Sequence, residues 1–249
     1  METQTKTDQP AWQALVNGLP FTKLQLSAEI AHVLETKGYL HLRWPMSIEH
    51  YEQLAGELGT IILRSDVKVD ANQEKAQEAV RVIKGRPGIY KPSALDMHTD
   101  PNADLVSWYC VEQEEIGGAM LMIDAGGLEK HFSPEEMAVL QKIELLSPGR
   151  ASDGSEIINR KPLLTKEKGK YRLFYVSWLL PDSYDDTTNK IFEKFVAYLK
   201  HKEETQLIEL PVKKQETVFI DNRRMLHGRR ALKENSRRHL VRLYLRTAA

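Results

Sequence analysis

A histidine and an aspartate stand two positions apart in the run MHTDP at residues 97–101. Side chains two positions apart in an extended chain point to the same face, so His98 and Asp100 can approach one ion together. With a distant second histidine they would form the 2-His-1-carboxylate triad that binds iron(II) and leaves coordination positions open. A lone His-x-Asp is common by chance, so the pair indicates a metal site only if a third donor joins it.

The third candidate donor is His227, in the run FIDNRRMLHGR at residues 219–229. A strand-like run and a polar Asp-Asn bend precede it, so we expect His227 just after a strand. Because His227 lies far from Asp100 in the chain, the triad requires remote strands to meet, as the two sheets of a jelly roll can. The other histidines have no comparable setting.

Two arginines, Arg238 and Arg242, follow His227 in the run RRHLVRLYLR at residues 237–246. Their spacing puts both side chains on one face if this run is a strand. A buried guanidinium needs an anion, and its planar fork matches a carboxylate in bidentate geometry. The anion is either a ligand or, in the plainer interpretation, a carboxylate of the protein itself.

Strand-like runs dominate the elements that must position these residues. They are expected at 39–43, 79–84, 104–113, 118–124, 171–178, 207–212, 217–220 and 239–246. Helices are expected from Ser27 to about Thr36 and over 47–59, 133–143 and 188–200, while 73–79 is a helix or an excursion. Ser133 and Glu136 form a capping-box pattern, and the apolar stripe of 188–200 is typical of core packing. The pattern predicts a mainly β fold with flanking helices around a double-stranded β-helix (jelly-roll) core.

Length and composition favour one globular domain over residues 1–249, with residues 1–12 as a flexible arm. Lys+Arg and Asp+Glu are both 35, so the chain lacks the basic excess that nucleic-acid or membrane-surface binding would use. No run approaches the roughly 18 apolar residues of a membrane span, and the first dozen residues lack a signal-peptide pattern. The single cysteine, Cys110, allows no internal disulfide, which is compatible with the reducing cytoplasm.

Together these motifs resemble the iron(II)/2-oxoglutarate-dependent dioxygenases of the taurine dioxygenase and clavaminate synthase superfamily. The likeness covers HTD at 98–100, the glycine pair at 117–118, RKPLL at 160–164, and the two runs at 219–229 and 237–246. It therefore spans about the last two thirds of the chain. In this superfamily Asn222 and the His227-Gly228-Arg229 triplet belong to the recurring tail pattern.

The resemblance implies that His98, Asp100 and His227 bind iron(II) and that Arg238 grips the distal carboxylate of 2-oxoglutarate. Arg242 matches a position that faces the cosubstrate or an anionic group of the substrate. One departure is Met120, because many relatives have a hydroxyl residue at this place that helps to hold the 2-oxoglutarate carboxylate. Relatives that halogenate lack the metal-binding carboxylate, so Asp100 favours hydroxylation.

The resemblance thus predicts an oxygenase that uses Fe(II), 2-oxoglutarate and O2 to hydroxylate a small polar metabolite, an amino acid or a derivative of one. Desaturation or cyclisation of the substrate is the alternative outcome of the same chemistry. Two other classes stay open on the sequence: a cupin-like metalloenzyme that does not use 2-oxoglutarate, and a jelly-roll binding module without catalysis. Tyr90, Trp108 and Tyr109 could line a pocket, but aromatic residues beside strands are more often core.

Overall fold

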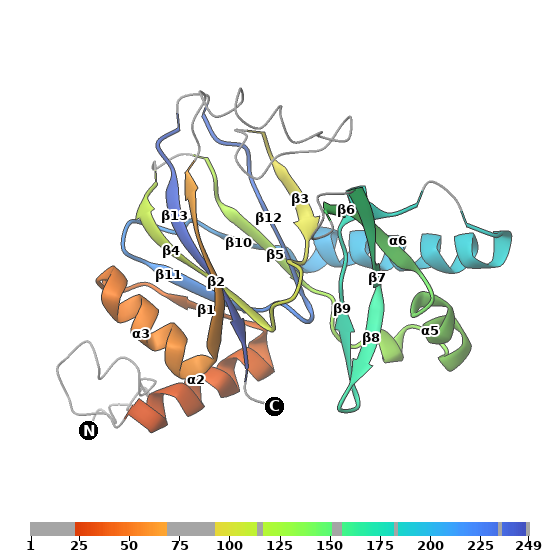
Figure 1. Cartoon of the computed structure of the whole chain (residues 1–249), viewed down its shortest axis with the longest axis horizontal. Coiled ribbons are helices and arrows are strands. Elements are labelled where there is room, and N and C mark those ends of the chain that lie inside the picture. The colour runs from red at the N-terminus through yellow and green to blue at the C-terminus, as the bar shows by residue number, and fades with distance from the viewer. Residues whose placement is uncertain are drawn as a thin grey trace, which may run out of the picture.

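The computed structural model describes residues 23–68, 93–113, 117–150, 156–181, 184–233 and 236–247. The expected arm at 1–12 and the elements expected at 73–79 and 79–84 lie outside these residues. Two antiparallel sheets face each other in the described part of the chain (Figure 1). This arrangement, with helices against the outer faces, confirms the predicted fold class.

The larger sheet has five strands in the order β1-β11-β4-β13-β2. Their bounds are Tyr39–Leu42 for β1, Thr217–Asp221 for β11, Leu105–Glu112 for β4, His239–Arg246 for β13 and Thr60–Lys68 for β2. Helices α2 (Lys23–Lys37) and α3 (Ile48–Leu58) pack on its outer face, where they share an apolar cluster with β4, β11 and β13 (Figure 1). Helix α2 begins before the predicted Ser27. Helix α3 is capped by Ser47 and Gly59, the two ends of its predicted range.

The smaller sheet has four strands in the order β10-β5-β12-β3. Their bounds are Ile208–Leu210 for β10, Met120–Asp124 for β5, Met225–Arg229 for β12 and Leu95–His98 for β3. Helix α6 (Asp186–Gln206) packs against both β5 and α5 (Pro134–Leu140). The predicted capping box at Ser133 is present, and the predicted apolar stripe of α6 faces the core through Phe195 and Leu199.

Two further hairpins follow α5 in the sequence, and only part of their last strand was predicted. Strand β6 (Glu144–Arg150) pairs with β7 (Glu156–Pro162), and β8 (Leu164–Glu167) pairs with β9 (Lys170–Leu173). The strand expected at 171–178 is wrong beyond Leu173, because the chain leaves β9 and forms the short 3-10 helix η3 (Ser177–Leu179). A second short 3-10 helix, η2 (Leu128–Lys130), precedes α5.

An apolar interior fills the space between the two sheets, and alternate residues of each strand build it. Its buried members include Val106, Trp108 and Cys110 of β4, Met120 and Met122 of β5, Met225 of β12, and Leu240 and Tyr244 of β13. His227 of β12 and Arg242 of β13 follow the same alternation, so both side chains project into this interior. Among the described residues no helix is both long and apolar enough to cross a membrane.

Phe195 of α6 lies among the aromatic rings of the apolar cluster between α6 and the smaller sheet. Its truncation to alanine tests this cluster. Phe195 is fully buried and its ring packs near those of Phe132, Tyr175 and Phe192. Phe195→Ala should lower the free energy of unfolding by about 3–5 kcal/mol, measured by urea denaturation. Val196→Ala, one position along on the exposed side of α6, should change it by less than about 0.5 kcal/mol. Equal losses would mean that Phe195 is not a core residue.

Candidate active site

His98 and His227 lie side by side on neighbouring strands of the smaller sheet. They are directly opposite each other in the register of β3 and β12, and their ring centroids are 4.4 Å apart. Both side chains are buried. As expected, His227 follows a strand, β11, and the Asp-Asn bend, and remote strands meet at the two histidines. However, His227 itself lies in a further strand, β12, and the histidines meet within one sheet rather than across two.

A glycine allows this close approach. A Cβ atom at Gly228, next to His227, would lie 2.6 Å from the backbone oxygen of Leu95 on β3. Real Cβ atoms do not come so near to a backbone oxygen, so any other residue here would push β3 and β12 apart. The Gly228 of the His-Gly-Arg triplet is thus explained by strand spacing.

Asp100 completes a group of three donors. Its Oδ2 lies 3.4 Å from Nε2 of His227, and one ligand atom from each of His98, Asp100 and His227 lies within 4.8 Å of the others. All three residues are buried. Nδ1 of His98 is 2.8 Å from the backbone oxygen of Asp96, so its Nε2 is the nitrogen left for a ligand. Two imidazoles and one carboxylate that converge in this way fit a divalent ion such as iron(II).

The protonation states of His98 and Asp100 suit metal binding. Burial, aided by the neighbouring His227, lowers the pKa of His98 to about 4, so this imidazole is neutral at pH 7. Burial alone would raise the pKa of Asp100, but the hydrogen bond and charge of His227 and the charge of Arg242 outweigh it and hold that pKa below its ordinary value. A neutral imidazole and an ionised carboxylate are the forms that coordinate metals.

Asn222 holds the backbone that carries Asp100. Its Oδ1 accepts from the backbone N–H of Asp100 at 2.8 Å, and its Nδ2 donates to the backbone oxygens of Asp100 and Ala103, each at 2.8 Å. Asn222 is 3% exposed and lies in the turn between β11 and β12, shortly before His227. One side chain therefore connects the loop that carries Asp100 to the turn that leads into the strand of His227.

Thr99, which lies between His98 and Asp100, is held by the segment that follows β9. Its backbone N–H donates to the oxygen of Tyr175 at 2.8 Å, and its hydroxyl accepts from the backbone N–H of Tyr175 at 2.9 Å. Val176 adds a β-bridge to His98. The segment between β9 and η3 thus extends the edge of the smaller sheet and fixes the end of β3.

The structure places the two predicted arginines at different distances from the triad. Arg242 lies opposite Trp108 in the register of β13 and β4, and its Nη1 is 3.5 Å from Oδ2 of Asp100. Arg238 lies just before β13 and is also buried. Its charge acts on Cys110, whose thiol pKa burial raises to about 12 and Arg238 partly lowers. Arg242 therefore borders the triad, whereas Arg238 lies four residues earlier in the chain, before β13 begins.

Two tryptophans that were not predicted as site residues flank the histidines. Trp178 of η3 lies against His98 with ring centroids 5.4 Å apart, and Trp108 meets His227 edge-on at 4.9 Å. Side chains alternate faces along β4, which puts Trp108 on the inner face. This alternation was the signal in the sequence that could have identified Trp108 as a site residue. Tyr109 points the other way, where its ring stacks on Tyr51 and its hydroxyl donates to the oxygen of Met46. Tyr90 lies outside the described residues.

Met120 occupies the place where many relatives have a hydroxyl. It is buried on the inner face of β5, directly opposite Arg229 of β12. Arg229 is buried as well, and burial lowers its pKa to about 10. A thioether can donate no hydrogen bond, so this position gives the interior polarisable apolar surface instead of a hydroxyl.

Comparison with known proteins identifies the family. The model of the taurine catabolism dioxygenase TauD, TfdA family matches residues 5–244, nearly the whole chain. The chain therefore belongs to this family, and it is an Fe(II)/2-oxoglutarate-dependent oxygenase. The family, the enzyme class and the cofactors predicted from the sequence are confirmed. Among curated proteins, none matches the chain.

Solved structures support the same fold at low sequence identity. Asparagine oxygenase in complex with Fe(II), 2S,3S-3-hydroxyasparagine and succinate is 15% identical, with a TM-score of 0.61 over 98% of this chain and 86% of that one. A variant of the non-heme iron oxygenase OrfP in complex with (3S)-hydroxy-L-Arg is 16% identical, with a TM-score of 0.63 over 98% and 88%. AAD-2 with Mn(II) and N-oxalylglycine is 12% identical, with a TM-score of 0.65 over 93% and 90%.

Removal of the Asn222 amide should destabilise the protein and loosen the Asp100 loop. Asn222→Ala leaves the buried N–H of Asp100 and the oxygens of Asp100 and Ala103 without this partner, at about 1–3 kcal/mol for each group that stays unsatisfied. We expect the free energy of unfolding to fall by about 3 kcal/mol in urea. Asn159→Ala on exposed β7 is the control and should cost less than about 0.5 kcal/mol. A loss no larger than that of the control would contradict the role given to Asn222.

Proposed function

We propose that this enzyme hydroxylates an unactivated C–H bond of a small polar metabolite, an amino acid or a derivative of one, and releases succinate and CO2. His98, Asp100 and His227 hold the iron(II) in this proposal. The observation that carries it is the convergence of one atom from each of these three buried side chains to within 4.8 Å. Fe(II) and 2-oxoglutarate, when bound, supply the oxidising chemistry, in which one atom of O2 enters succinate and the other enters the product.

Arg238 is the proposed anchor for the distal carboxylate of 2-oxoglutarate. It is buried and lies just before the strand that carries Arg242, four residues before that arginine. A charged fork in such a place suits one end of a dicarboxylate whose other end reaches the metal. The buried side chains of Cys110 and Leu240 lie near Arg238 and lower the polarity around it. Low polarity strengthens the attraction between the two charges.

Arg242 has two proposed tasks. Its contact with Asp100 keeps that carboxylate ionised and oriented toward the histidines. Two of its contacts are long: Nη1 lies 3.5 Å from Asp100, and Nε lies 3.4 Å from Ser65 Oγ. A guanidinium has five N–H donors, so these contacts do not use all of them. Arg242 can therefore also bind an anionic group of the cosubstrate or the substrate beside the metal.

The proposed substrate class rests on the site and on the relatives. Arg242 provides a contact for a carboxylate, and Trp178 and Trp108 provide aromatic surface next to the two imidazoles. Asparagine oxygenase and OrfP, which share the fold, were solved with hydroxylated amino acids. Desaturation or cyclisation of the same class of substrate is the second candidate, because it needs the same triad and the same cosubstrate.

Turnover of the cosubstrate is the direct test of the proposal. Purified protein given Fe(II), ascorbate, O2 and 2-oxoglutarate should form succinate slowly, and the true substrate should raise that rate by at least about tenfold. A screen of free amino acids and their derivatives, with succinate measured by liquid chromatography, identifies the substrate. Mass spectrometry of the product then separates hydroxylation, which adds one oxygen, from desaturation or cyclisation, which removes two hydrogens. No turnover with any compound, together with no binding of 2-oxoglutarate, would favour a binding module instead.

The anchor role of Arg238 predicts a selective loss. Arg238→Ala should weaken 2-oxoglutarate binding at least about 100-fold, because it removes a charge-assisted bidentate contact, while metal affinity changes by less than about threefold. Calorimetric titration with Mn(II) and then with 2-oxoglutarate measures both. Arg237→Ala, the exposed neighbour, is the matched control and should leave both constants unchanged. Equal weakening of metal and 2-oxoglutarate in Arg238→Ala would make Arg238 a scaffold residue.

A further inference from the structure

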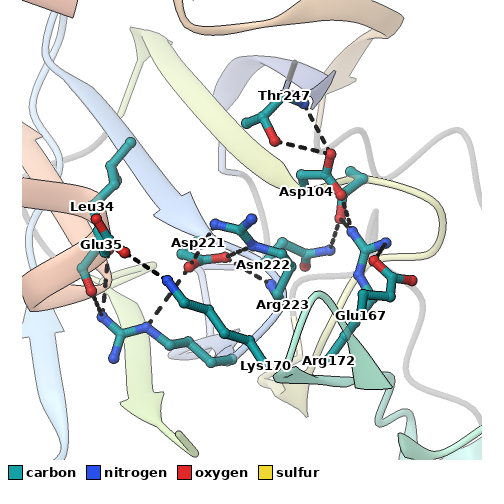
Figure 2. Close-up of polar contacts among 12 residues, drawn as sticks. Leu34, Glu35, Asp104, Glu167, Lys170, Arg172, Asp221, Asn222, Arg223 and Thr247 are labelled. Atoms are coloured by element: carbon teal, nitrogen blue, oxygen red, sulfur yellow. Dashed lines mark hydrogen bonds and ion pairs between the residues drawn. The ribbon is translucent and has the colours of Figure 1, made fainter. Parts of the chain in front are cut away.

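The loop from Asp100 to Asp104 is held from outside the jelly roll by an arginine of the β8–β9 hairpin. Arg172 of β9 donates from Nη2 to the backbone oxygen of Ala103 at 3.1 Å. It also forms a close ion pair with Oδ1 of Asp104 (Figure 2). Both side chains are largely buried, with 20% of Arg172 and 10% of Asp104 exposed. Nη1 of Arg172 also lies 3.6 Å from a carboxylate oxygen of the exposed Glu167. Of the two carboxylates, Asp104 is the more buried, so loss of Arg172 would leave a poorly solvated charge on Asp104.

Asp104 is fixed at its second oxygen as well. Its Oδ2 accepts from the backbone N–H of Thr247 at 2.9 Å and from the Thr247 hydroxyl at 3.3 Å (Figure 2). The backbone N–H of Asp104 donates to the oxygen of Leu245. Asp104 thus joins the hairpin to the end of β13. The Asp104 end of the loop from Asp100 to Asp104 is therefore held by two separate segments of the chain, the β8–β9 hairpin and the residue after β13.

The contact of Arg172 extends to Asp100 through one shared acceptor. The oxygen of Ala103 receives Nη2 of Arg172 and also Nδ2 of Asn222, and the same Asn222 amide holds both the N–H and the oxygen of Asp100. The path from the hairpin to the carboxylate donor is therefore a continuous hydrogen-bonded chain. The backbone of Asp100 cannot shift without stretching a contact in it.

We infer that Arg172 is a positioning residue for Asp100, so that the geometry of the proposed metal site depends on a hairpin outside the double-stranded β-helix. This inference deepens the proposed function and rests on it, because it assumes that Asp100 is a metal ligand. Partners beyond the direct ligands commonly contribute about tenfold or more to metal affinity. Arg172 acts through the loop backbone, so its effect belongs at the lower end of that range.

The same hairpin provides a matched control. Lys170 lies two residues before Arg172 on β9 and pairs with Glu35 of α2 at 2.6 Å (Figure 2). Both of these side chains are exposed, at 77% and 64%, and the contact does not involve the loop of Asp100. Lys170→Met and Arg172→Met therefore remove one paired cation each from one strand, but only Arg172→Met releases the oxygen of Ala103 and the carboxylate of Asp104.

The test is Co(II) binding to the full chain, followed by the visible d–d absorption of the ion and by calorimetry. Arg172→Met should weaken Co(II) about tenfold and change the absorption band, whereas Lys170→Met should stay within about twofold of the wild type with an unchanged band. Asp104→Asn is a second test in case Arg172→Met folds poorly. It keeps an oxygen for Thr247 but loses the charge that faces Arg172, so it should also weaken Co(II) and change the absorption band.

The outcomes separate the inference from the proposal beneath it. Asp100→Gly should abolish the Co(II) band, and retention of the wild-type band and affinity there would overturn the metal site itself. If Asp100→Gly loses the ion while Arg172→Met and Asp104→Asn bind it like the wild type, Arg172 is only a scaffold and the positioning role is wrong. A lower thermal midpoint in Arg172→Met with unchanged Co(II) affinity and spectrum would likewise contradict the positioning role.

Discussion

The alignment of β3 and β12 is the constraint on which the rest of the site depends. His98 and His227 face each other across this strand pair, and side chains alternate faces along a strand. A shift of one residue in either strand would turn one imidazole out of the interior. The glycine beside His227 sets the distance between the strands, and the β-bridge at Val176 secures the other side of β3. Hydrogen bonds of the sheet therefore determine whether the two donors can share an ion.

The third donor is controlled differently, because Asp100 lies in a loop. A loop residue has no ladder to fix it, so its backbone must be held by other groups. Asn222 satisfies the backbone of Asp100, Thr99 is bonded to Tyr175, and the end of the loop is bonded to β9 and to the residue that follows β13. Rigidity in this loop means that a metal ion would meet donors already in place, which reduces the ordering cost of binding.

Local periodicity in the sequence was informative where nearby residues decide the structure. The proximity of His98 to Asp100, the cap at Ser133 and the stripe of α6 were all expected on such grounds and are present. Strand β12 was not predicted, because the run Met-Leu-His-Gly-Arg has a glycine and two ionisable residues, and only the neighbouring β3 and β5 make it a strand. The exposed edge strand β2 was also missed, since three apolar residues in succession, Ile61 to Leu63, show no alternation. Contacts such as that of Arg172 with Asp104 join remote segments, and no local pattern indicates them.

The position of Cys110 has a practical consequence for work under air. It is the single cysteine of the chain, and it is sealed in the interior with a pKa raised to about 12 by burial. Almost none of it is thiolate at neutral pH, and thiolate is the form that attacks disulfides or reacts with alkylating agents. Folded molecules therefore have no sulfur available to cross-link one copy to another. Oxygenated buffers, which this chemistry requires, do not need added thiol reductant to keep the chains separate.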